Sequence, residues 1–112
     1  MAKHVLVVLS NPVAGKEEEY NKWYTQQHLD DVLKVPGFVA AQRFKFGTDT
    51  GVPSSLKYLA IYEMETDDIV AATEGLTAAR DAGSMYISPA IDLDHVVATV
   101  YTPITERMTK KK

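Results

Sequence analysis

The chain has 112 residues, a net charge of −3 at pH 7 and a hydrophobic fraction of 46%, values typical of one soluble globular domain. It has no basic stripe apart from three lysines at the C-terminal end, so nucleic acid is not an expected partner. Cysteine is absent, which excludes a thiol nucleophile, a disulfide framework and thiolate metal sites, and is compatible with a cytoplasmic location.

The first element is a short apolar run that predicts a β-strand. Residues 4–10 contain the sequence VLVVL, and Asn11 and Pro12 end the run. A β-branched run of this kind predicts a strand that is buried on both faces. Five apolar residues are too few to span a membrane, and no small-residue cleavage site follows them. We therefore expect neither a membrane partner nor a signal peptide.

The next segment, from residue 16 to about residue 33, predicts an amphipathic helix with an unusual inner face. Glutamates fill its first turn, where the helix dipole favours acids, and Pro36 and Gly37 end it. At about 100° per residue, one face of this helix carries aromatic rings and polar side-chain ends: Tyr20, Trp23, Tyr24, Gln27, His28 and Asp31. Each polar tip costs about 1–3 kcal/mol if it is buried without a partner. A cavity filled by water or a ligand is therefore expected beneath this helix.

Two strands joined by a polar loop are predicted after the helix. Residues 38–46 alternate, which places Phe38 on one face and Arg43 on the other. Residues 56–63 form the second strand, and the length of the loop between them suits an antiparallel hairpin. Tyr62 on this strand is a candidate either for the pocket or for a dimer seam, because the sequence does not determine the register.

A second helix and a last strand complete the pattern. Thr66 is the expected N-cap of this helix, Gly83 ends it, and Gly75 is a candidate break within it. The last strand is predicted over residues 93–101. Residues 103–112 have no periodicity, and we expect them to form a flexible, solvated tail.

The order βαββαβ over residues 1–102 predicts one α+β domain with a ferredoxin-like fold. Such a domain has a four-stranded antiparallel sheet with both helices on one face. The helix-free face would carry an apolar set larger than a soluble monomer usually exposes: Val5, Val7, Leu9, Leu59 and Ile61. We therefore expect a homodimer in which two sheets pack face to face.

Residues 11–46 resemble the dimeric α+β barrel superfamily and, within it, the EthD-like branch. The matching features are the Trp23-Tyr24 pair, His28 soon after it, the VPGF turn at residues 35–38, and Arg43 on the strand that follows. This resemblance implies a dimeric barrel with a pocket between the sheet and the first helix of each protomer. Relatives include polyketide cyclases, muconolactone isomerases, haem-degrading monooxygenases, dye-decolourising peroxidases and stress proteins with no known activity, so the fold does not select one reaction.

His28 is the leading candidate for a catalytic group. It lies on the aromatic face of the helix with Asp31 one turn further on, an arrangement that holds a general base near neutral pH. Alternatively, His28 is only a cation that favours the C-terminal end of the helix dipole. Tyr24, or Tyr20 one turn before it, would donate a hydrogen bond to the negative charge that develops on a substrate.

The candidate substrate-binding residues are Tyr20, Trp23, Gln27, His4, Asp31 and Tyr62. Trp23 could equally belong to the core. His4 enters through the resemblance, because polyketide-cyclase relatives place a histidine near this position in the pocket; the alternative is an exposed histidine at a frayed strand end. Arg43 could recognise an anionic substrate or form an interface ion pair, and we favour the ion pair.

The sequence offers no clear cofactor or metal site. Asp92, Asp94 and His95 do not predict one, because neighbouring strand residues point to opposite faces. Phosphate-binding, flavin and nicotinamide motifs are absent. A cofactor-independent isomerase, cyclase or lyase acting on a small apolar carbonyl compound is our main hypothesis. The alternatives are a non-catalytic binding protein and a haem-binding monooxygenase in which His28 is the axial ligand.

Overall fold

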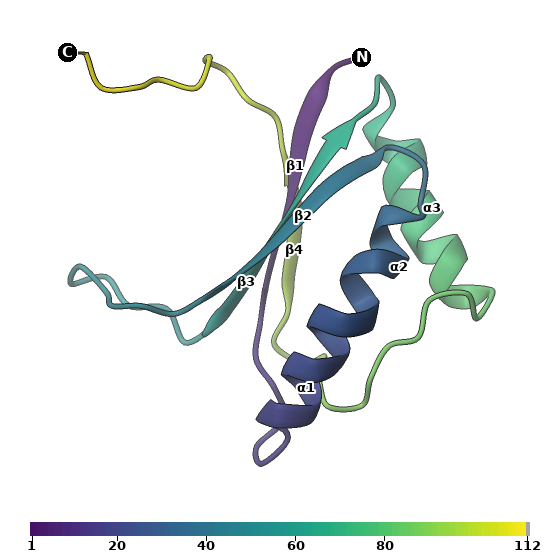
Figure 1. Ribbon diagram of the computed structural model, residues 1–112, viewed down its shortest axis with the longest axis vertical. Helices are drawn as coiled ribbons and strands as arrows, with labels where there is room; N and C mark the ends of the chain where they lie inside the picture. The colour runs from purple at the N-terminus through teal and green to yellow at the C-terminus, as the bar shows by residue number, and fades with distance from the viewer. Residues whose placement is uncertain (112) are drawn as a thin grey trace.

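The computed structural model describes residues 1–111. It consists of a four-stranded sheet that is covered by helices on one face (Figure 1). Its elements are β1 (Lys3–Ser10), α1 (Glu17–Trp23), the π-helical segment η1 (Tyr24–His28), α2 (Leu29–Leu33), β2 (Phe38–Lys45), β3 (Tyr58–Glu65), α3 (Ile69–Asp81) and β4 (Val97–Tyr101). The strand order is β2-β3-β1-β4, and all pairs are antiparallel. This is the predicted ferredoxin-like fold.

The side chains of the central strand β1 alternate between two apolar faces of the sheet. Leu6 pairs with Tyr62 on β3, and both side chains are buried beneath the helices. Val7 pairs with Ile61, and alternation places both side chains on the opposite face, where they are only half-buried. The predicted apolar set therefore does lie on the helix-free face of the sheet.

The first helix runs without interruption through α1, η1 and α2, but its centre is wider than an α-helix. The backbone N–H of Leu29 donates to the carbonyl oxygen of Tyr24, five residues earlier, where an α-helix would bond to the fourth. The sequence analysis did not predict this π-helical turn. It changes which side chains of the segment lie next to each other.

A β-bulge on β2 makes the predicted alternation of this strand wrong. Phe38 pairs with Met64 of β3 and Ala40 pairs with Glu63, so the chain contains one extra residue between these two pairs. One extra residue moves every following side chain of the strand to the opposite face of the sheet. As a result, Phe38 and Arg43 both lie on the helix-covered face, although the sequence placed them on opposite faces.

Helix α3 begins two residues later than predicted and contains no break. Its N-cap is Asp68, whose carboxylate accepts the N–H of Ala71 at 3.0 Å, while the Thr66 hydroxyl accepts the N–H of Asp68. Gly75 lies inside an uninterrupted helix, and a Cβ there would lie 3.0 Å from Cγ1 of Val35. The glycine is therefore the point at which α3 approaches the end of the first helix.

The last strand is shorter than predicted because its first four residues form a turn. The N–H of His95 donates to the carbonyl oxygen of Asp92, and β4 begins at Val97. Residues 102–111 are exposed and form no strand or helix, and they extend away from the helices (Figure 1). Residue 112 of the predicted tail lies outside the described residues. Within residues 1–111, no helix combines the length and the apolar character that a bilayer span requires.

Candidate functional site

A cavity of about 330 Å³ lies between the helix-covered face of the sheet, the first helix, α3 and the segment 85–96. Most of its wall is apolar: Leu6, Val8, Val32, Leu76, Met85, Ile87, Ile91, Leu93, Val96 and Ala98. Four of the predicted site residues also line it, namely Trp23, Tyr24, His28 and Tyr62. A concave, mostly apolar cavity with a few polar groups is the usual form of a small-molecule site.

His28 contributes an unpaired imidazole to this cavity. Its ring stacks on Trp23, with centroids 4.6 Å apart, and meets Tyr24 edge-on at 5.0 Å. Nδ1 is sealed from solvent and is the one such side-chain atom without a hydrogen-bond partner within residues 1–111. Nε2 is not sealed in this way, and the ring of His28 lines the cavity.

Burial, and not Asp31, controls the protonation of His28. Desolvation lowers the pKa of His28 to about 4, and the charge of Asp31 opposes this effect only in part. Asp31 does not line the cavity, and its carboxylate lies 3.9 Å from the ammonium group of Lys34. The expectation of a histidine held near neutral pH by Asp31 is therefore wrong. His28 is a neutral imidazole at pH 7.

Two phenols form a hydrogen-bonded pair beside His28. The hydroxyl of Tyr62 donates to the hydroxyl oxygen of Tyr24 at 3.1 Å, and both rings are buried. The hydrogen of the Tyr24 hydroxyl has no acceptor among the residues described. Burial raises the pKa of Tyr24 to about 12 and also raises the pKa of Tyr62. Both phenols are therefore protonated at neutral pH, and Tyr24 can donate to a ligand.

Trp23 belongs both to the core and to the cavity wall. It is 7% exposed, and its indole N–H donates to the carbonyl oxygen of Tyr86 at 3.0 Å. This hydrogen bond ties the first helix to the loop that closes one side of the cavity. Trp23 is the only tryptophan of the chain, so its fluorescence can report on a ligand bound next to it.

Tyr20 does not line the cavity. It is fully buried, and its hydroxyl oxygen lies 2.5 Å from the hydroxyl oxygen of Ser10. Its ring packs against Tyr24 and Tyr58, with centroids 5.6 and 5.2 Å away. Sequence reasoning placed Tyr20 in the pocket because a dry phenol is costly, but Ser10 satisfies this phenol inside the core.

Arg43 lies on the far side of the same aromatic group. Its guanidinium lies 4.5 Å from the ring centroid of Tyr24 and donates to the side-chain oxygens of Asn21 and Thr25, both at 2.8 Å. Because the side chain is turned toward the first helix, the interface ion pair predicted for it is wrong for a dimer formed through the helix-free face. Tyr24, which lines the cavity, thus also contacts a cation.

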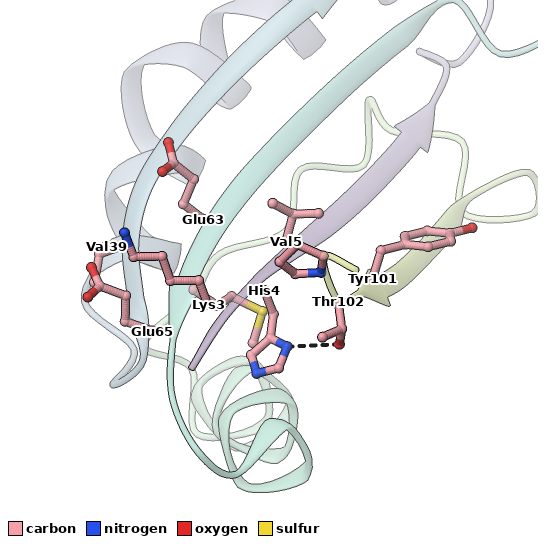
Figure 2. Close-up of a pocket in the computed structure, with 10 residues that line it drawn as sticks. Lys3, His4, Val5, Val39, Glu63, Glu65, Tyr101 and Thr102 are labelled. Atoms are coloured by element: carbon pink, nitrogen blue, oxygen red, sulfur yellow. Dashed lines mark hydrogen bonds between the residues drawn. The ribbon is translucent and has the colours of Figure 1, made fainter. Parts of the chain in front are cut away.

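His4, near the start of β1, lines a separate pocket with Thr102 and Pro103 (Figure 2). It is 7% exposed, so the alternative of a solvent-exposed histidine is wrong. Nδ1 lies 2.9 Å from the Thr102 hydroxyl and Nε2 lies 3.2 Å from the carbonyl oxygen of Thr66. One neutral tautomer satisfies both contacts, with Nε2–H donating to the carbonyl and Nδ1 accepting from the hydroxyl. His4 and His28 therefore do not share a site.

Gln27, Asp92 and His95 also lie outside the cavity. Gln27 is exposed and lines a shallow depression on the outer side of the first helix. His95 forms an exposed ion pair with Asp92 at 2.9 Å, and the hydrogen bond from His95 lowers the pKa of Asp92. None of the three can touch a ligand that occupies the cavity beside His28.

Sequence reasoning missed the polar residues that α3 presents to the cavity. Thr73, Thr77 and Arg80 line it next to Leu76. Their spacing of four and three residues places them on one face of a helix, and this pattern is visible in the sequence. Nothing in the sequence indicates that this face, and not the opposite one, looks toward the first helix.

Comparisons with known proteins identify the fold but not the activity. No family model matches the chain, and no curated protein matches it either. Solved structures do match. The chain is similar to an EthD family protein from Bacillus halodurans C-125, with a TM-score of 0.60 and 12% identity over 93% of this chain and 100% of that one.

Two further solved structures are also similar to the chain. A candidate monooxygenase from Shewanella loihica PV-4 has a TM-score of 0.64 and 16% identity over 93% of this chain and 96% of that one. The haem degrader MhuD from Mycobacterium tuberculosis, which holds two haems in its active site, has a TM-score of 0.56 and 15% identity over 94% and 99%. At these identities the likeness establishes a shared fold. The chain therefore has the ferredoxin-like α+β fold of EthD family proteins, and the resemblance seen in the sequence is confirmed at that level.

Proposed function

We propose that the protein binds a small, largely apolar ring compound that carries a carbonyl group, and that it catalyses a proton transfer on that compound. The observation that carries this proposal is the position of His28. Its imidazole lines an apolar cavity next to the Tyr24–Tyr62 pair, and its Nδ1 has no hydrogen-bond partner within residues 1–111. A cavity of about 330 Å³ is at the small end of the usual range of about 300–1,000 Å³ for ligand pockets, which suits one or two rings.

The protonation states of His28 and Tyr24 suit the two halves of a proton transfer. Neutral His28 accepts a proton from the carbon next to the substrate carbonyl. The electron pair of the broken C–H bond moves into the enolate, whose oxygen accepts a hydrogen bond from the protonated Tyr24. His28 then returns the proton to another carbon of the same molecule. The product is an isomer of the substrate, and no external oxidant or reductant is consumed.

The low pKa of His28 limits the substrate class. An imidazole whose pKa is about 4 is a weak base, so it can remove only a proton that is already acidic. Carbons between two carbonyl groups, or next to a carbonyl in an unsaturated ring, meet this condition. Simple ketones do not. We therefore favour cyclic diketones and unsaturated lactones.

A titration followed by an exchange measurement tests the proposal. Ligands are first found by quenching of Trp23 fluorescence, with a panel of cyclic diketones, unsaturated lactones and phenolic compounds. Bound compounds are then incubated in D₂O, and loss of their α-proton signal is followed by NMR. Exchange should be accelerated by the native protein but not by His28→Phe. The matched control is His95→Phe, because His95 is exposed and does not line the cavity.

Three outcomes would change the conclusion. Binding without exchange in either protein would leave a non-catalytic binding protein, which is the alternative that the EthD resemblance also permits. Equal exchange with the native protein and His28→Phe would show that His28 is not the base. Failure of every compound in the panel to quench Trp23 would count against the cavity as a ligand site.

Haem is a second candidate ligand, because the similar structure of MhuD holds two haems in its active site. A neutral His28 with an accessible Nε2 is a suitable axial ligand in its chemistry. The volume of about 330 Å³ is too small for a porphyrin macrocycle, and within residues 1–111 Arg80 is the only lining cation for its two propionates. The residues therefore do not fit haem in this conformation, and a Soret band after addition of haem would contradict that conclusion.

The apolar helix-free face supports a homodimer as part of the proposal. Val5, Val7, Leu9, Leu59 and Ile61 lie together on a face that no described helix covers. Removing such a face from water contributes about 25 cal/mol for each Å² of apolar surface. We also place the protein in the cytoplasm, a proposal supported by its lack of cysteine.

A further inference from the structure

Among residues 1–111, the cavity beside His28 is lined by one permanent charge, the guanidinium of Arg80 on α3. The other lining residues are apolar, aromatic or hydroxyl-bearing, apart from His28, which is neutral at pH 7. No carboxylate lines the cavity within residues 1–111. An anion placed there would meet a positive charge at one end of a mostly apolar wall.

The guanidinium N–H groups of Arg80 are free to donate hydrogen bonds to a ligand. Its only ion-pair contact among the described residues joins Nε to the carboxylate of Asp81 at 3.5 Å, and both side chains are more than half exposed. Ion pairs of this exposed kind contribute little. Both Nη groups remain unpaired. Thr77, one turn before Arg80 on the same face, also has no hydrogen-bond partner in the described part of the chain.

We propose that Arg80 binds a carboxylate on the ring compound, so that the ligand is a small cyclic or aromatic acid. The ring lies against Trp23 and His28, and the acid group reaches the opposite wall at α3, where the planar guanidinium can donate two parallel hydrogen bonds. Thr77 supplies a further donor at the same wall. This inference rests on the proposed function, because it assigns the substrate class of the same cavity.

Two features near Arg80 oppose anion binding, and one of them can be removed. Arg80 lies in the last turn of α3, where the carbonyl groups carry partial negative charge, and Asp81 adds a full one. Asp81→Asn removes that full charge and frees Nε. This substitution is therefore expected to tighten the binding of an acid and to leave the binding of a neutral analogue unchanged.

The test compares each acid with its primary amide, which has the same shape and no charge. Benzoic, cinnamic and cyclohexenecarboxylic acids and their amides are titrated at pH 7, with quenching of Trp23 as the readout. The native protein should bind the acids roughly two to five times more tightly than the amides, because the Arg80 side chain is more than half exposed. Arg80→Gln should lose this preference while its affinity for the amides stays the same, and Arg80→Lys should retain part of it. Arg107→Gln, which removes an exposed arginine of the tail, is the matched control and should behave as the native protein.

The outcomes separate this inference from the proposed function. Equal affinity for acids and amides in the native protein would overturn the role of Arg80 and leave the cavity as a binding site. An acid preference that survives in Arg80→Gln would also overturn it. If neither the acids nor the amides bind, both the ligand site and the role of Arg80 are overturned.

Discussion

The imidazole of His28 stacks on the indole of Trp23, with ring centroids 4.6 Å apart and ring planes inclined by 29°. Five residues of a regular α-helix would separate these two side chains by roughly 140° around the axis. The π-helical turn over Tyr24–His28 has more residues per turn and brings them to the same side. Because π-helical turns often occur at functional sites, this stack links the backbone irregularity to the candidate site.

Replacement of His28 by phenylalanine should stabilise the fold. The change retains a planar ring on Trp23 and removes Nδ1, a buried nitrogen that has no hydrogen-bond partner within residues 1–111. An unpaired buried polar atom costs about 1–3 kcal/mol, so we expect His28→Phe to gain about 1 kcal/mol. Urea unfolding followed by circular dichroism, at equal protein concentration, measures this gain. A loss of stability would show that Nδ1 is paired in solution.

Stability should also fall in mild acid because of His28. The pKa of this group is 6.5 in the unfolded chain and about 4 in the folded one, so between these values only the unfolded chain binds the proton. The contribution is fully present above pH 6.5 and is lost as the pH falls toward 4. From pH 7 to pH 5 the loss is about 2 kcal/mol. The difference in unfolding free energy between the native protein and His28→Phe at these two pH values isolates this contribution.

Loss of the Tyr24 hydroxyl should reduce turnover more than binding. Tyr24→Phe removes the donor to the enolate oxygen, and we expect turnover to fall roughly a hundredfold. It also leaves Tyr62 without its acceptor, at a cost of about 1–3 kcal/mol in stability. Tyr20→Phe is the matched control, because it breaks a buried hydrogen bond to Ser10 outside the cavity. If both variants lost turnover equally, the effect of Tyr24→Phe would be one of stability alone.

A charge on the helix-free face of the sheet should produce monomers. Val7 lies opposite Ile61 on this face, so Val7→Asp would place a carboxylate inside the proposed interface. Light scattering should then report half the mass of the native protein. Val70→Asp adds the same charge to an exposed position of α3 and should not change the mass. A native protein that is already monomeric at micromolar concentration would contradict the interface.

Much of the architecture could be predicted from patterns in the sequence. The alternation along β3 can be seen in the sequence and places Tyr58, Ala60 and Tyr62 on one face, as the structure has them, because a strand has a period of two. The bulge on β2 could not be predicted in the same way. An inserted residue has no signature when small residues such as Ala40 and Ala41 occupy both faces.

By itself, the sequence determined the order of the elements, the apolar character of both sheet faces and the aromatic and polar inner side of the first helix, since these follow from side-chain periodicity alone. Only the tertiary structure decided which of those polar tips share a cavity. Tyr20 found a partner in Ser10, and His28 found none, although the two lie on the same helix. Hydrogen-bond partners come from segments distant in the chain, and their positions depend on the register, the bulge and the π-helical turn together.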